Sequence, residues 1–200
     1  MVLGRIRSAL DGAPKPGGVP REYRRTFGEP DLDLLVERLE DYRAVVHRGV
    51  DVAAFVSAIL DGCGLPRDAT VVVPPALPAG WLPPSVRARI DDGLDAAAIA
   101  AADAVVTAAT VAVAETGTIV LDGSGDQGRR IITLLPDLHI CVLRPDQVVA
   151  AVPEALERLD PRRPLTWISG PSATSDIELN RVEGVHGPRN LHVILLETPR

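Results

Sequence analysis

Short apolar runs recur along the chain, separated by segments in which apolar residues are spaced as on one face of a helix. The runs at 44–47, 70–73, 140–143, 165–168 and 191–196 are rich in aliphatic residues, which predicts strands. Because most of these runs do not alternate between apolar and polar residues, they are typical of strands buried on both faces. The pattern therefore predicts a sheet that is covered by helices.

Three more runs, at 104–107, 111–113 and 118–121, follow one another closely. The segments between them are too short to contain helices, so a hairpin-like set of strands is expected there.

Helices are expected where a capping residue precedes a segment of helical spacing. Asp31 is followed by apolar residues at 32, 35, 36 and 39, which share one face of a helix. Similar signals after Asp51, Asp95 and Pro145 predict helices over 52–60, 96–102 and 147–159. Helices between apolar strands predict a three-layer α/β domain with a mostly parallel mixed sheet.

Residues 1–30 differ in composition from the rest of the chain. Residues 1–10 can form a short amphipathic helix, and 11–30 are dense in glycine and proline, as in an extended arm. This basic arm is either solvated or docked against a partner. Residues 31–200 have the length of a single α/β domain.

Composition excludes several classes of function. The 200 residues carry a net charge of −6 and 3% aromatic residues, which disfavours nucleic acid as a partner. No segment is expected to span a membrane or direct export, so a cytoplasmic protein is expected. Cys63 and Cys141 are expected to be reduced and buried. Because two thiolates cannot hold a four-cysteine cluster, no metal or other cofactor is expected in this chain.

A hydroxyl-rich loop follows the predicted strand 165–168. It extends from Ser169 to a helix start expected near Asp176. Ligands of parallel sheets bind beyond the carboxyl ends of strands, and hydroxyls with free backbone N–H groups suit a phosphate or carboxylate. The same hydroxyls can instead only cap the helix and satisfy the turn.

Three ionisable groups elsewhere are also candidates. Glu115 lies in an apolar region, where it either has a partner or a function or faces water at a sheet edge. His186, between two glycines, can act as an acid or base or can be structural. Arg129, with Arg130, can bind an anion or lie exposed on the surface. The remaining histidines are expected to be ordinary, partly buried residues in or beside strands: His47, His139 and His192.

Residues 123–128 match the dinucleotide fingerprint G-x-G-x-x-G and follow a strand. However, Asp122 and Asp126 place negative charge where a pyrophosphate would bind. The preceding strands are also too close together for a βαβ unit. A dinucleotide site is therefore not expected here.

Four segments occur together and in order, at 114–118, 134–140, 168–178 and 184–188. In this combination they resemble the lactate-utilisation protein C family, which is built on the LUD domain. The resemblance implies a fold similar to the sugar-phosphate isomerase and CoA-transferase superfamily. It also implies participation in oxidation of L-lactate to pyruvate alongside two iron–sulfur subunits, this chain being the subunit without a cluster.

We expect the 116–118 turn, the 169–176 loop and His186 to form one pocket for a small anion, such as the carboxylate of a hydroxy acid, with Glu115 or His186 accepting the hydroxyl proton. The expected ligand-binding residues are Thr116, Gly117, Thr118, Arg129, Ser169, Gly170, Ser172, Thr174, Ser175 and Asp176. Two other functions stay open. One is a CoA-transferase-like enzyme with Glu115 as its nucleophile, and the other is a non-catalytic assembly or regulatory module.

Overall fold

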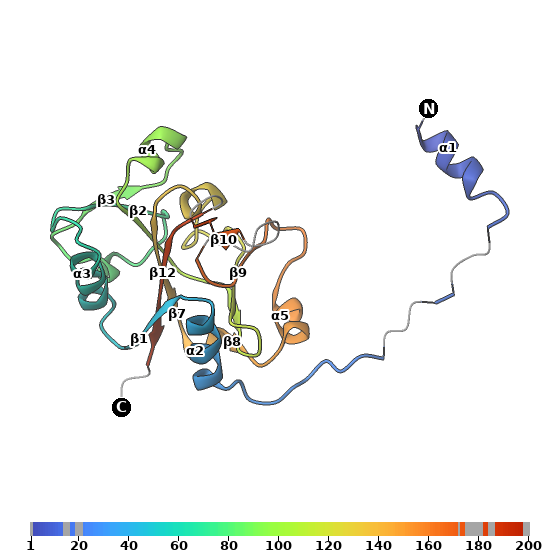
Figure 1. Ribbon diagram of the computed structural model, residues 1–200, viewed down its shortest axis with the longest axis horizontal. Coiled ribbons are helices and arrows are strands. Elements are labelled where there is room, and N and C mark those ends of the chain that lie inside the picture. Colours follow the sequence, from blue (N-terminus) through green and yellow to red (C-terminus); the bar gives the residue numbers. More distant parts are fainter. Residues whose placement is uncertain are drawn as a thin grey trace.

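The computed structural model describes residues 2–13, 17–18, 22–171, 173–174, 182–183 and 187–197 (Figure 1). Its α-helices are α1 (Val2–Ala9), α2 (Leu32–Asp41), α3 (Val52–Gly62), α4 (Ala96–Ala100) and α5 (Val152–Arg158). Its short 3₁₀ helices are η1 (Ala79–Trp81), η2 (Arg130–Thr133) and η3 (Pro145–Gln147).

A parallel sheet forms the centre of the fold. Its strands are β1 (Val45–Gly49), β2 (Thr70–Val73), β3 (Arg87–Ile90), β4 (Ala104–Thr107), β7 (Leu138–Leu143) and β12 (Asn190–Leu196). They lie in the order β1-β12-β7-β4-β2-β3, and every neighbouring pair is parallel. The predicted α/β class with a mostly parallel sheet is confirmed.

A second, smaller sheet covers part of this one. It is formed by β5 (Val111–Val113), β6 (Thr118–Leu121), β8 (Val148–Val149) and β9 (Thr166–Ile168), in the order β8-β5-β6-β9. Two short strands, β10 (Ala173–Thr174) and β11 (Val182–Glu183), form a separate antiparallel pair. The three closely spaced runs therefore do not form one set. β5 and β6 are an antiparallel hairpin, whereas β4 belongs to the central sheet.

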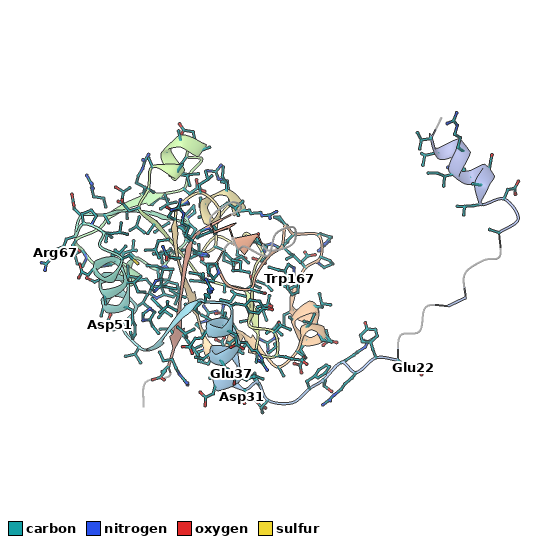
Figure 2. All side chains as sticks on the ribbon, viewed as in Figure 1. Glu22, Asp31, Glu37, Asp51, Arg67 and Trp167 are labelled. Atoms are coloured by element: carbon teal, nitrogen blue, oxygen red, sulfur yellow. The ribbon has the colours of Figure 1, made fainter. Side chains whose placement is uncertain are left out.

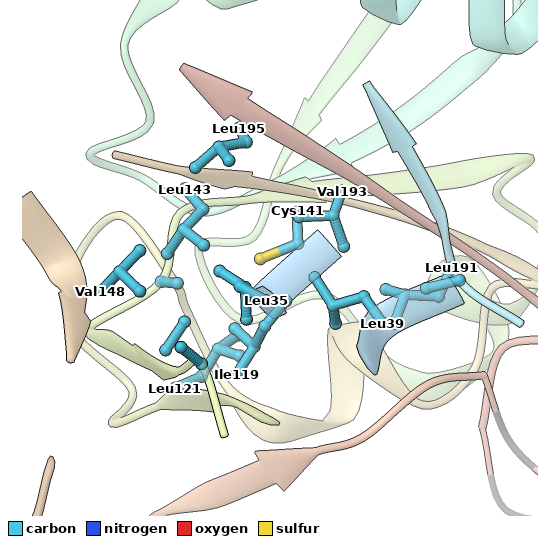
Figure 3. Close-up of a cluster of buried hydrophobic side chains, with 14 residues drawn as sticks. Leu35, Leu39, Ile119, Leu121, Cys141, Leu143, Val148, Leu191, Val193 and Leu195 are labelled. Atoms are coloured by element: carbon cyan, nitrogen blue, oxygen red, sulfur yellow. The ribbon is translucent and has the colours of Figure 1, made fainter. Parts of the chain in front are cut away.

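The two faces of the central sheet pack against different layers. Alternate residues of a strand point to opposite faces. Cys141 and Leu143 accordingly pack with Leu35 and Leu39 of α2 and with the small sheet, as Figure 3 shows. Ile140 and the other even-numbered positions of β7 pack instead against α3. The expected three layers are present, and one outer layer contains a sheet as well as helices.

The predicted helix over 147–159 is wrong in its first half. Val148 and Val149 form β8, which pairs with β5, and the helix begins only at Val152. Pro153 explains the difference, because a proline lacks the amide hydrogen of a helical bond and clashes with the carbonyl four residues earlier. A proline is tolerated in the first turn, so the helix starts beside it.

Aspartates cap three helices as the sequence predicts. The side chain of Asp31 accepts hydrogen bonds from two backbone N–H groups of α2, and Asp51 and Asp95 accept one each in α3 and α4. Strand β3 is not anticipated by the sequence pattern. It is an edge strand whose four residues are all exposed, so it carries no run of buried side chains to indicate it.

The N-terminal segment lies away from the sheets in Figure 1, and no residue of α1 is buried. Closer to the body, the backbone N–H of Phe27 donates to a carboxylate oxygen of Glu154 at 2.9 Å. None of the helices in the described part of the chain combines the length and hydropathy that a membrane span requires.

Candidate anion-binding site

The turn of the β5–β6 hairpin and the loop after β9 are adjacent because β6 pairs with β9. The hydroxyl of Thr116 donates to that of Thr118 at 2.8 Å, and the Thr118 hydroxyl lies 2.8 Å from that of Ser169. Two segments separated by about fifty residues in the sequence are thus joined by a chain of three hydroxyls. The structure brings these predicted residues together.

Two predicted site glycines allow both segments to approach α2. Gly117 has φ +58°, and a Cβ there would lie 2.7 Å from the Cβ of Arg38. Gly170 has φ +90°, and a Cβ there would lie 2.5 Å from the carbonyl oxygen of Tyr42. Both positions require glycine, since its absence of a side chain permits positive φ and close backbone contact. These two glycines therefore allow the turn and the loop to pack directly against the C-terminal end of α2.

A cavity of about 280 Å³ lies next to this loop. Ser169 and Gly170 line it, together with Arg130, His139, Trp167 and Thr133. Trp167, labelled in Figure 2, is 41% exposed. The volume suits a small organic acid, because small-molecule sites have volumes of this order or larger.

Glu115 lies outside this cavity. Its side chain is exposed on the hairpin turn, and its backbone N–H donates to the carbonyl of Ala150 at 3.1 Å. Of the two alternatives weighed for this residue, the structure shows a glutamate that faces water. Thr116, Gly117 and Thr118 also do not line the cavity; Thr118 reaches it through the hydroxyl of Ser169.

The two neighbouring arginines have different surroundings. Arg129 is bound to Asp91, whose side chain is 1% exposed, through both carboxylate oxygens, and it also donates to the carbonyl of Leu94 at 2.8 Å. Hydrogen bonding to Arg129 lowers the pKa of the Asp91 carboxyl below its usual value. The backbone carbonyl of Arg130 accepts a hydrogen bond from the Thr133 hydroxyl, but its guanidinium makes no hydrogen bond or ion pair with any described residue, although Arg130 lines the cavity. The guanidinium of Arg130 is therefore more available to a ligand than that of Arg129, the arginine that the sequence predicted.

His139 is the residue that sequence reasoning missed. It is 1% exposed rather than partly buried, and its Nε2 lies 2.8 Å from the Thr107 hydroxyl. Burial lowers its pKa to about 4, so the imidazole is neutral at pH 7. Its position in β7 resembles that of any core residue. Only the pairing of β4 with β7 and the cavity above them distinguish it.

Several predicted site residues lie outside the described residues. These are Ser172, Ser175, Asp176 with the helix start expected there, and His186. The backbone of Thr174 forms part of β10, but its side chain is not among those described. Gly187 and Pro188, which directly follow His186 in the sequence, line the cavity.

The other histidines lie on the opposite face of the central sheet. His47 Nε2 is 3.0 Å from His192 Nδ1, and His192 Nε2 is 3.9 Å from the Cys63 sulfur. Cys63 is exposed, which corrects the expectation that both cysteines are buried. Within the described ranges, no three histidine, cysteine, aspartate or glutamate side chains converge as metal ligands do.

Comparison with known proteins shows the family of this chain. The sequence pattern that defines the LUD domain matches residues 91–196, which is more than half of the chain. A protein of Deinococcus radiodurans named lactate utilization protein C is 48% identical over 170 residues, covering 82% of this chain and 79% of that protein. The chain belongs to the LUD domain family.

A second relative matches a smaller part of the chain. Lactate utilization protein C 1 of Bacillus mycoides is 34% identical over 104 residues, covering 48% of this chain and 44% of that protein. A crystal structure of a DUF162 family protein from Deinococcus radiodurans shares the fold, with a TM-score of 0.71 and 38% identity. The superposition covers 83% of this chain and 96% of that one.

Proposed function

We propose that this LUD domain protein takes part in oxidation of L-lactate to pyruvate as the subunit that binds the hydroxy acid. Relatives that carry the name lactate utilization protein C support the lactate role, the first of them at 48% identity. Removal of two electrons from lactate requires an acceptor. Two cysteines are too few to hold a four-cysteine cluster, so the proposal assigns the electrons to two iron–sulfur partner subunits.

The observation that carries this proposal is the exposed Arg130, whose guanidinium has no partner among the described residues, beside a cavity otherwise lined by neutral groups. A guanidinium binds a carboxylate through two parallel hydrogen bonds, which makes arginine well suited to a hydroxy acid. The hydroxyl of Ser169 and the imidazole of His139 can bond to the second polar group of the ligand. That group is a hydroxyl in lactate and a carbonyl in pyruvate.

The neutrality of His139 favours binding over proton removal. A base with a pKa of about 4 is weak at pH 7, whereas a neutral ring nitrogen still accepts or donates a hydrogen bond. His139 therefore orients the ligand in this proposal. The predicted proton acceptor His186 remains part of the proposal, supported by the placement of the adjacent Gly187 at the cavity.

Acyl transfer with Glu115 as the nucleophile receives no support from this geometry. The carboxylate is exposed on a turn and lines neither of the cavities near the hydroxyl-rich loop. A nucleophile needs a bound substrate within reach, and no such space adjoins Glu115 among these cavities.

Calorimetric titration of the purified protein with L-lactate and pyruvate tests the proposal. Replacing Arg130 with glutamine should weaken binding at least about tenfold, because a hydrogen bond to a charged group contributes about 1.5–3 kcal/mol. Arg67→Gln is the matched control, since Arg67 is exposed, does not line the cavity, and lies on the opposite side of the body from the cavity residue Trp167 in Figure 2. Absence of saturable binding by the unaltered protein, or equal binding by the Arg130 and Arg67 variants, would contradict the proposal.

A further inference from the structure

A second, larger cavity adjoins the first. Its volume is about 460 Å³, and it shares Arg130, Thr133 and Thr166 with the smaller one. A hydroxy acid of three carbons does not need this space, which falls within the range of 300–1,000 Å³ typical of sites for larger small molecules. We infer that this cavity binds a phosphate monoester with an apolar carbon body, a ligand beyond the proposed hydroxy acid.

The cavity lies at the edge of the sheet where ligands of parallel α/β folds bind. Pro75 follows β2, and Asp91 follows β3, and both line it. Most residues of the glycine-rich loop 123–128 also line it, and the loop is held at this edge by two backbone bonds. Ala76 N–H donates to Gly125 at 2.8 Å, and Ala108 N–H, after β4, donates to Asp126 at 2.9 Å. The site therefore lies beyond the carboxyl ends of three parallel strands.

The structure removes the electrostatic objection raised by the two aspartates of this loop. Asp122 is turned inward, where it accepts hydrogen bonds from the backbone and hydroxyl of Ser124 and forms an ion pair with Arg163 at 3.2 Å. Neither Asp122 nor Asp126 lines the cavity. The negative charges that argue against a phosphate in the sequence therefore do not face the space where it would bind.

The charged residues that do line the cavity leave an excess of positive charge. They are Asp91, Arg129 and Arg130, and Asp91 is neutralised by Arg129. The bonds of Arg129 use Nε and Nη2, so they leave Nη1 without a partner among the described residues. The guanidinium of Arg130 has no partner among them. A dianionic phosphate is the small group that best matches two guanidinium groups with free donors.

The loop also offers backbone donors. Carbonyl groups of the loop accept the bonds that anchor it, whereas the N–H groups of Gly123 and Gly125 make no bond with any described residue. Gly128 has φ +73°, and a Cβ there would lie 2.8 Å from the Ile132 side chain, so glycine lets the loop pack closely at this edge. Such N–H groups add to an anion site that already contains cations.

The rest of the lining selects the carbon part of the ligand. Pro75, Leu121 and Pro164 present apolar surface to the same cavity. An ion such as inorganic phosphate leaves this surface exposed to water. An ester with a flat or apolar body buries it and should bind more tightly.

Phenyl phosphate is a suitable probe. Inorganic phosphate and phenol, which each carry one half of it, are the comparison ligands. Ligand-observed NMR titration of the full chain should show saturable binding of phenyl phosphate, tighter than that of either half. Pro164→Glu places a negative charge at the exposed rim of this cavity alone and should weaken binding at least about tenfold, whereas the neutral Pro164→Gln should not. Arg130→Gln should weaken it as well, and it breaks no ion pair with a described residue.

Ser169→Ala changes only the smaller cavity and should leave phenyl phosphate binding unchanged. The inference is overturned if phenyl phosphate does not bind saturably. It is also overturned if inorganic phosphate binds as tightly, or if Pro164→Glu and Pro164→Gln bind alike. Lactate binding without phenyl phosphate binding would refute this site and leave the proposed function intact, and the reverse result would refute only the proposed function.

Discussion

Protonation of His139 should couple the stability of the fold to pH. The imidazole is fully buried at the base of the smaller cavity, and burial lowers its pKa from 6.5 to about 4. The two values differ by about 2.5, and one pKa unit corresponds to about 1.4 kcal/mol, so the coupling is about 3 kcal/mol. Between these pH values the unfolded chain binds a proton that the folded chain does not. The stabilisation is therefore complete above about pH 6.5 and is lost as the pH falls towards 4.

Urea denaturation of the wild type and of His139→Gln measures this effect. Glutamine retains a side chain that can hydrogen-bond to Thr107 but does not titrate, while His47 and His192 titrate equally in both proteins. The free energy of unfolding should fall by about 3 kcal/mol more in the wild type than in the variant between about pH 7 and pH 4. Parallel pH profiles for the two proteins would show that His139 is not held neutral by burial and would refute the reasoning.

Two further substitutions test the packing that positions the site. Leu35 is fully buried where α2 packs against the small sheet, so Leu35→Ala should lower the free energy of unfolding by about 2–5 kcal/mol in urea denaturation. Leu156 is 55% exposed, so the control Leu156→Ala should change it far less. Equal losses would contradict the assigned core. Gly170→Ala should lower the free energy of unfolding by at least about 1 kcal/mol, because φ is +90° and the new Cβ would lie 2.5 Å from the Tyr42 carbonyl oxygen. It should also weaken lactate binding, because it displaces the loop. Unchanged stability and binding would show that the loop does not depend on this close contact.

Local signals in the sequence were sufficient to predict the positions of most helices and strands. Aspartate caps mark the starts of α2, α3 and α4, and unalternated apolar runs mark the buried strands β2, β4 and β7. Such signals fail where an element has no buried face or where one residue overrides a pattern. β3 is exposed throughout, and Pro153 delays a helix whose apolar spacing begins earlier.

The candidate site was only partly predictable for a related reason. Hydroxyls at 116, 118 and 169 could be identified as polar groups near strand ends, and the pairing of β6 with β9 does bring them together. The difference between Arg129 and Arg130 has no local signal. It depends on Asp91, which lies 38 residues before Arg129 and binds its guanidinium, whereas the Arg130 guanidinium has no partner among the described residues.

The sequence by itself determined the α/β class and the positions of the capped helices, because these follow from short-range periodicity and capping residues. It indicated the family only through the resemblance of four ordered segments. Only the tertiary structure decided that His139 lines a cavity, that Glu115 faces water and that the acidic side chain of Asp122 turns away from the glycine-rich loop's cavity. The physical reason is that burial and ion pairing depend on which distant segments meet. That is fixed by the order and register of the strands rather than by any residue's neighbours in the chain.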